Sequence, residues 1–185
     1  MESLITDILS QSAGNTEFRT KDIPNLELYM DQIIGFINGN FAPNSVEKEK
    51  LLTKTMIHNY SKEGLIKPVK GKKYSKEHII QMILVYQLKN TLKISDIKAL
   101  LTNIYAWEGY NASMLAANYD KHMDSKDKLE GDAAAFIDIM LAKENLSLDN
   151  KEDAFVLLLN MAALSACFKS LSEGLVDYIC NKNDE

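Results

Sequence analysis

The segment from Met56 to Ser75, MIHNYSKEGLIKPVKGKKYS, constrains the fold more than any other part of the chain. Its first half has the spacing of an amphipathic helix and ends at Gly64, after which Pro68 and Gly71 follow. Glycine commonly ends a helix, and proline cannot continue one. The stretch IKPVKGKKY then has room only for two small strands around a turn. The sequence therefore predicts a helix followed by a short β-wing.

The rest of the chain favours helices, because its 185 residues include only 8 glycines and 3 prolines. Apolar spacing and capping residues predict helices at residues 3–11, within 26–40, from Thr53 to about Glu63, at 76–90 after Ser75, at 96–105 after Ser95, within 128–145, and from Asp149 or Asn150 to about residue 180. The region 108–122 remains ambiguous. The expected fold class is all-α with a small β-wing, in which a winged helix-turn-helix domain precedes a helical domain.

This order of elements predicts three parts. Residues 1–24 form an N-terminal helix and linker, 25–104 form the winged helix-turn-helix domain, and 105–185 form an acidic helical domain for dimerisation or effector binding. The last helix is apolar around most of its girth, so we expect several neighbours to bury it. Those neighbours belong either to this chain or to a second copy. Symmetric pairing commonly covers such surplus apolar surface, which predicts a homodimer.

Charge is distributed unevenly along the chain. Residues 1–40 carry a net charge of −4, residues 41–100 carry +7, and residues 101–185 carry −8. A basic segment between acidic flanks is typical of a nucleic-acid contact surface joined to other modules. The alternative is a solvated lysine surface that has no partner.

The helix that begins after Thr53 is expected to have two unlike faces. At about 100° per residue, Met56, Ile57, Tyr60 and Gly64 fall on one side, which faces the core. The opposite side carries no carboxylate, and its polar residues are Lys54, Thr55, His58, Asn59 and Lys62. Asparagine can pair with adenine in the major groove, and lysine can reach guanine or phosphate. An ordinary exposed polar helix face is the alternative interpretation.

Four lysines crowd the predicted wing: Lys67, Lys70, Lys72 and Lys73. A wing beside the helix would bring Lys70, Lys72 and Lys73 to the backbone of a DNA duplex, where they would position the protein rather than recognise sequence. Tyr60 and Tyr74 would then support the helix and the wing from behind, and Gly64 would support the turn between them.

The run from Lys54 to Leu101 resembles the DNA-binding domain of the mercury-resistance-regulator (MerR) superfamily. The landmarks that match in order are Tyr60, Gly64-Leu65, Pro68, Lys73-Tyr74-Ser75 and Ile97-Lys98-Ala99-Leu100-Leu101. The chain resembles still more closely a bacterial domain family of unknown function, through Met56, Asn59, Tyr60, Lys62 and Lys72-Lys73-Tyr74. The resemblance to MerR implies a transcription regulator that binds double-stranded DNA sequence-specifically. The alternative is a protein–protein interaction module that keeps the winged-helix fold without binding DNA.

An aromatic cluster follows the predicted DNA-binding domain. Tyr105, Trp107 and Tyr110 are candidates to line a pocket for a small apolar effector between the two modules. The alternative is that they form interdomain core or a dimer contact.

Other classes of function lack a signature in the sequence. There is no glycine-rich phosphate loop, no His-Glu-x-x-His motif and no cysteine spacing typical of metal sites, so we expect no enzyme, no cofactor and no metal. The N-terminus is a poor signal peptide, and no segment is expected to reach the roughly 18 apolar residues that span a bilayer. Cys167 and Cys180 are expected to be free thiols. These features predict a cytoplasmic protein that does not contact a membrane.

Overall fold

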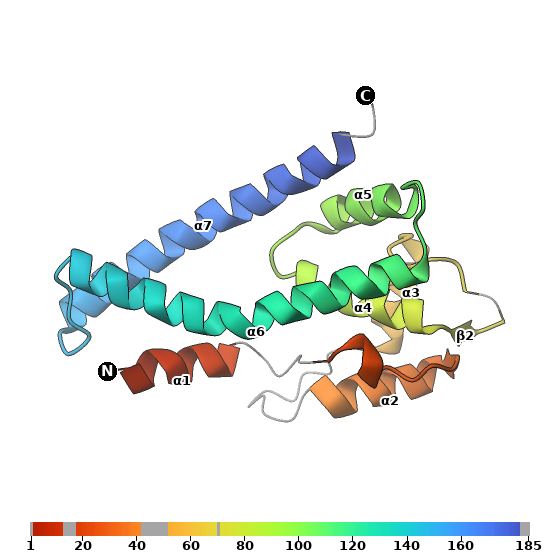
Figure 1. The fold of residues 1–185 in the computed structure, drawn as a ribbon, viewed down its shortest axis with the longest axis horizontal. Helices are drawn as coiled ribbons and strands as arrows, with labels where there is room; N and C mark the ends of the chain where they lie inside the picture. The colour runs from red at the N-terminus through yellow and green to blue at the C-terminus, as the bar shows by residue number, and fades with distance from the viewer. Residues whose placement is uncertain (1, 13–17, 42–51, 70, 182–185) are drawn as a thin grey trace.

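The computed structural model describes residues 2–12, 18–41, 52–69 and 71–181 (Figure 1). Its elements run in the order α1 (Glu2–Ser12), the 3-10 helix η1 (Thr20–Asp22), β1 (Leu28–Tyr29), α2 (Met30–Phe41), α3 (Lys54–Lys62), β2 (Lys73–Tyr74), α4 (Lys76–Leu88), α5 (Ile94–Tyr105), α6 (Ala112–Lys143) and α7 (Lys151–Asn181). The mostly helical fold with a small sheet agrees with the expected all-α class.

The sheet is a single antiparallel pair, with Leu28 opposite Tyr74 and Tyr29 opposite Lys73. The expected hairpin within residues 66–74 is wrong: only β2 forms in the described part of this segment, and its partner β1 comes from just before α2. The physical reason is burial. Ile66 is only 3 % exposed, so the start of the segment lies in the core and is not free to form an outer strand.

The core lies between α2, α3, α4, α5 and the first half of α6. Helix α4 is its centre, and its buried residues are Ile79, Ile80, Gln81, Met82, Ile83 and Val85. Side chains from the surrounding elements close over it, among them Ile33, Ile57, Ile97 and Met123, each fully buried. A helix surrounded on all sides is apolar on all sides, which explains the run of apolar residues in α4.

The helix boundaries follow the capping residues in most places. Thr53 caps α3, because its Oγ1 accepts a hydrogen bond from the Met56 N–H at 3.2 Å. Ser75 precedes α4, where its N–H donates to Nδ1 of His78 at 3.1 Å. The prediction for Ser95 is wrong, since α5 already begins at Ile94 and Ser95 lies inside its first turn.

The ambiguous region 108–122 and the predicted helix at 128–145 join into one long helix, α6. Asn111 begins it by accepting a hydrogen bond from the Met114 N–H at 2.9 Å. Helix α7 begins as expected after Asn150, whose Oδ1 accepts a hydrogen bond from the Glu152 N–H at 3.0 Å. Short α1 lies along α6, with Ile5 buried.

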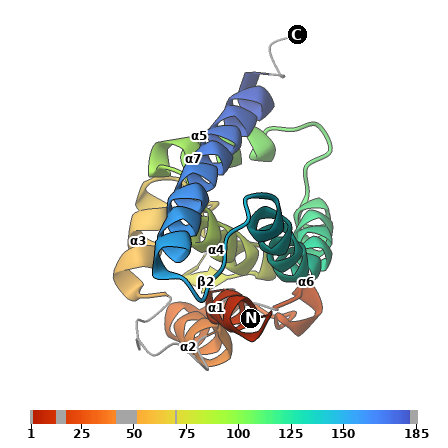
Figure 2. The same ribbon diagram turned by 90° about the vertical axis from the view of Figure 1, so that its left-hand side faces the viewer.

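Helix α7 is mostly exposed, so of the two sources of neighbours that the sequence left open, the described part of this chain supplies few. In Figures 1 and 2, α7 diverges from α6 and lies along α5 only in its C-terminal part. Among its described residues only Leu157 and Val176 are buried. The apolar composition of α7 calls for neighbours, and the described residues supply them only around Leu157 and Val176.

Helix α7 corrects a different expectation. Its 31 residues include an 18-residue window of mean hydropathy 1.7, so by length and composition alone it could cross a membrane. The apolar residues between Ala154 and Phe168 are interrupted by no charge, and this is why the window passes.

Candidate nucleic-acid interface

Helix α3 presents a polar face to solvent and is anchored by its opposite face. Ile57 is fully buried and Tyr60 is 6 % exposed. The structure leaves every residue predicted to face DNA on this helix exposed, namely Lys54, Thr55, His58, Asn59 and Lys62. The helix therefore has the one-sided arrangement that insertion into a groove requires.

Both ends of α3 are held rigidly. Before the helix, the Asn38 side chain forms two hydrogen bonds with the backbone of Leu52, at 2.9 and 3.0 Å. After it, Gly64 adopts a φ of +73°, and the Leu65 N–H donates to the Tyr60 carbonyl at 2.8 Å. This reversal needs a left-handed residue, for which glycine has no steric penalty. The exposed face of α3 is thus fixed relative to the core.

The two predicted supporting tyrosines are both 6 % exposed. Tyr74 lies in β2, and its ring contacts His78 edge-on with centroids 5.9 Å apart. Burial, together with nearby Tyr86, raises the pKa of Tyr60, so its hydroxyl stays protonated. Within the described part of the chain this buried hydroxyl has no hydrogen-bond partner.

The segment predicted as the wing, residues 66–74, has a tight turn before β2 that exposes lysines. Gly71 and Lys72 both have positive φ, +63° and +64°, and Lys73 follows in β2. The left-handed backbone conformation costs an L-residue such as lysine roughly 1–2 kcal/mol, and it is uncommon outside turns. Lys72 and Lys73 are exposed, and the Lys73 ammonium lies 5.4 Å from the centre of the Tyr29 ring. Lys70 lies outside the described residues.

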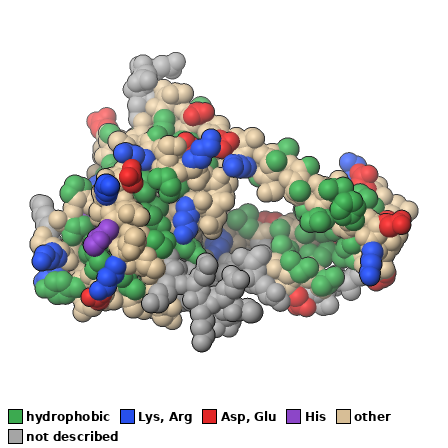
Figure 3. Space-filling model, turned by 180° about the vertical axis from the view of Figure 1, so that it is seen from behind, with side chains coloured by type: hydrophobic (Ala, Val, Ile, Leu, Met, Phe, Trp, Pro, Cys, Tyr) green, Lys and Arg blue, Asp and Glu red, His purple; other side chains and the backbone are tan. Residues whose placement is uncertain are grey.

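One carboxylate lies at the edge of this surface. Asp31, in the first turn of α2, pairs with Lys54 at 2.7 Å, and both side chains are well exposed. Exposed pairs of this kind contribute only about 0–1 kcal/mol, so the ammonium can exchange partners at little cost. Figure 3 shows Lys and Arg side chains gathered around a His at the end of the molecule formed by α2, α3 and the wing.

The segment before β1 is clamped to the first half of α6. The Tyr119 hydroxyl donates to the Phe18 carbonyl at 2.7 Å. Thr20 donates twice to the Asp120 carboxylate, from its N–H at 2.9 Å and from its hydroxyl at 2.6 Å, and Arg19 pairs with Asp124. These contacts join two segments about a hundred residues apart, so the two ends of the intervening unit are held together.

A family model described as "Domain of unknown function (DUF1836)" matches residues 18–122, more than half of the chain. The chain belongs to the DUF1836 family. The match begins and ends at the two segments that the clamp joins. It is wider at both ends than the domain 25–104 expected from the sequence. The predicted likeness to a domain family of unknown function is therefore confirmed. No curated protein and no solved structure matches the chain.

One wing lysine turns into the DUF1836 unit instead of toward solvent. The Lys67 ammonium lies 2.9 Å from a Glu77 carboxylate oxygen and 4.0 Å from the centre of the Tyr110 ring. Its backbone N–H donates to Oε1 of buried Gln81 at 3.0 Å. No local sequence signal separates Lys67 from its neighbours, because its partners lie ten or more residues away.

The predicted aromatic cluster lies around this lysine. The Tyr110 hydroxyl donates to Glu77 at 2.6 Å, and the Tyr105 hydroxyl donates to the Leu65 carbonyl at 3.2 Å. Trp107 instead donates to Oδ1 of Asn103 at 2.9 Å. The structure thus brings Tyr105 and Tyr110 together at the base of the wing, against Lys67 and Glu77. The effector pocket proposed for them stays a prediction.

Ionisation in this cluster is shifted by its contacts. Burial raises the pKa of Glu77, but hydrogen bonds from Tyr110 and Lys67 and the Lys67 charge outweigh it, and the net pKa lies below its ordinary value. Burial and the neighbouring carboxylate raise the pKa values of Tyr105 and Tyr110. Glu77 is therefore ionised and both phenols are neutral at physiological pH.

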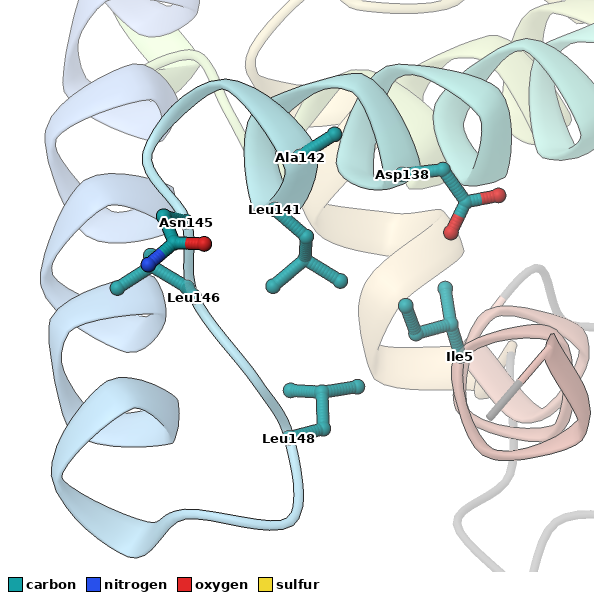
Figure 4. Close-up of a pocket in the computed structure, with 7 residues that line it drawn as sticks. All are labelled: Ile5, Asp138, Leu141, Ala142, Asn145, Leu146 and Leu148. Carbon is teal, nitrogen blue, oxygen red and sulfur yellow. The ribbon is translucent and has the colours of Figure 1, made fainter.

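Two cavities lie away from α3. One of about 360 Å³ lies between α1 and the turn from α6 to α7 (Figure 4), and it is lined by Ile5, Asp138, Leu141, Ala142, Asn145, Leu146 and Leu148. Another of about 560 Å³ lies between residues 25–27 and the starts of α4 and α6. Neither is lined by residues of α3. Over the described residues, no group of His, Cys, Asp and Glu side chains is arranged to hold a metal ion.

Proposed function

We propose that the DUF1836 unit binds double-stranded DNA sequence-specifically, as a cytoplasmic, non-enzymatic transcription regulator with a MerR-like winged helix-turn-helix. The observation that carries this proposal is the outer face of α3. It has only polar and basic side chains, no carboxylate of its own, and a buried opposite face that holds it in place.

In this proposal α3 enters the major groove. Thr55, His58 and Asn59 occupy the exposed side and contact base edges, with Asn59 suited to adenine. Lys54 and Lys62 lie toward the two ends of the helix and contact the phosphates that flank the groove. The free N–H groups of the first turn favour a phosphate near Lys54.

The wing supplies backbone contacts beside the helix. Lys72 and Lys73 follow the turn at Gly71, and β2 is joined to β1 next to α2, so they are carried by the same rigid unit as α3. Together with Lys70 they contact phosphates and add affinity without sequence preference. Lys67 is excluded from this set because Glu77 neutralises it.

A second candidate is a protein–protein interaction module that keeps the same fold. The Lys54–Asp31 pair favours it, since a surface of mixed charge also suits a protein partner. The two candidates differ in what the α3 face recognises, so a binding experiment on DNA decides between them.

The test is selection from a pool of random duplexes, followed by fluorescence anisotropy across a salt series. Five phosphate contacts imply a log–log slope of affinity against salt near −4 to −5, at about −0.9 for each contact. We expect an enriched motif and a slope in this range. If no duplex binds even at low salt, the DNA proposal is wrong and the interaction module replaces it.

A further inference from the structure

The hairpin formed by α6 and α7 exposes far more apolar surface than the rest of the molecule. Its exposed large hydrophobic residues are Leu129, Phe136, Ile139, Phe155, Val156, Leu158, Leu159, Phe168, Leu171, Leu175 and Tyr178, each between 41 % and 65 % exposed. Figure 3 shows hydrophobic side chains gathered at the end of the molecule where α6 turns into α7, beside a hollow under α7. Surface of this kind marks an interaction site.

The exposed residues follow the spacing of helix-packing positions. On α6, the exposed Leu129 and Phe136 and the half-buried Ala133 and Met140 recur every three or four residues along one side. Helix α1 occupies a different side of α6, since Ile5 and Leu141 line one cavity between the two helices. This stripe on α6 is therefore ready to receive a helix and receives none from the described part of the chain.

On α7 the exposed stripe changes sides along the helix. The first half exposes Phe155, Leu158 and Leu159 and the second half exposes Phe168 and Leu171. At about 100° per residue, Phe155 and Phe168 point roughly 140° apart. The reason is that α7 turns Leu157 inward at one end and Val176 inward at the other. A flat partner would cover one of these sides only, whereas a pair of helices can cover both.

The surroundings of α7 disfavour a lipid bilayer as the covering partner. The helix is attached at its C-terminal end, where Val176 is buried and the Asn103 side chain donates to the Cys180 carbonyl at 3.3 Å. Residues 101–185 carry a net charge of −8, which anionic lipid headgroups repel. The stripe on α6 also lies beside the exposed acid Asp132, which does not enter hydrocarbon.

The amount of surface matches a stable protein dimer. Eleven half-exposed large side chains contribute on the order of 100 Å² each. The total of about 1,000 Å² for one chain exceeds the roughly 800 Å² that each partner contributes to a standard interface. A symmetric pair requires one surface that complements itself, and two identical hairpins offer apolar stripes of equal length to each other.

We propose that a second copy of this chain covers the α6–α7 hairpin, so that two hairpins pack into one bundle of four long helices. The two DUF1836 units then lie outside the bundle with their α3 faces free. This proposal does not depend on DNA binding, because it concerns a different surface.

The test compares two leucines of nearly equal exposure. Leu158, on α7, is 61 % exposed, and Leu26, before β1, is 60 % exposed. Light scattering of the full chain at micromolar concentration should give the mass of a dimer for the wild type and for Leu26→Glu, and the mass of a monomer for Leu158→Glu. Circular dichroism of each variant checks that helix content is retained.

Two results would overturn the proposal. One is a wild-type chain that stays monomeric at all concentrations up to about 100 μM, because an interface of standard size should already associate below this concentration. The other is co-sedimentation of the wild type, but not of Leu158→Glu, with phosphatidylcholine vesicles, which would assign the surface to lipid. If Leu158→Glu does not fold, the wild-type mass and the vesicle assay still decide.

Discussion

The DUF1836 unit and the α6–α7 hairpin are built from similarly apolar helices but use them differently. Between residues 18 and 123 the described chain has a continuous core, whereas between residues 124 and 181 only Leu157 and Val176 are buried hydrophobics. Helix α4 is surrounded by neighbours, whereas the main helix contact of α7 in the described chain is with α5. The same kind of sequence thus gives a core helix in one region and an unpartnered helix in the other.

This difference also separates two kinds of exposed surface. The unit exposes lysines, hydroxyls and amides on α3, and the hairpin exposes leucines and phenylalanines. Binding through polar surface of the first kind suits a charged partner and becomes weaker as salt is added. Binding through apolar surface of the second kind is insensitive to moderate salt. A chain with both can bind two partners independently, and the proposals for DNA and for a second copy follow this division.

The largest effect is expected from emptying the core of the unit. Ile97→Ala should lower the free energy of unfolding by about 2–5 kcal/mol, because Ile97 is fully buried and its loss leaves a cavity. The matched variant Ile139→Ala changes a side chain that is 65 % exposed on α6. Urea unfolding, measured at a protein concentration too low for dimers to form, should show a loss of less than about 1 kcal/mol for Ile139→Ala. Equal losses would mean that the hairpin is as well packed as the unit.

The next effect concerns the partly buried ion pair between Lys67 and Glu77. Glu77→Gln should cost about 1.5–3 kcal/mol, because it leaves the half-buried Lys67 ammonium without its anion. Glu108→Gln removes an exposed carboxylate and serves as the control. Chemical denaturation of both variants measures the difference. If Glu77→Gln behaves like the control, the Lys67 ammonium can turn to solvent and can contact phosphates together with the other wing lysines.

On the exposed face of α3, base recognition is expected to separate from charge. Asn59→Ala should cost roughly 1–3 kcal/mol on the selected site and little on random DNA. Lys72→Ala combined with Lys73→Ala should weaken binding to both kinds of DNA and make the salt slope shallower by roughly two. Anisotropy titrations measure both. The reverse pattern would exchange the roles of helix and wing, and no effect from either would favour the protein-interaction module.

A smaller effect is expected when pH is varied, through Glu77, Tyr105 and Tyr110 of the unit. The lowered pKa of Glu77 gives stability that is present above its ordinary value of 4.5 and is lost as the pH falls through the lowered pKa. The raised pKa values of Tyr105 and Tyr110 give stability that is present below pH 10 and is lost as the pH rises further. Thermal melts should therefore fall at both extremes, and Glu77→Gln should flatten the acid side.

Local features of the sequence were sufficient to predict the boundaries of α3 and most of its two faces, although Gly64, expected to face the core, is exposed. Thr53 and Gly64 act on backbone groups within one turn of themselves, and the placement of Ile57 and Tyr60 inside follows from helical periodicity. The start of α7 after Asn150 was predicted for the same reason. Such signals depend on nearest neighbours along the chain, so the sequence contains all the information they need.

Contacts between distant segments were decided only by the tertiary structure. The partner of β2 is β1, more than forty residues earlier. Lys67 pairs with Glu77 next to Ile66, which is buried in the core. The clamp between Phe18 and Tyr119 likewise has no local signature. Apolar periodicity showed that α7 needs neighbours, but it cannot say whether the chain supplies them. That depends on how many elements surround each helix, which is a property of the whole fold.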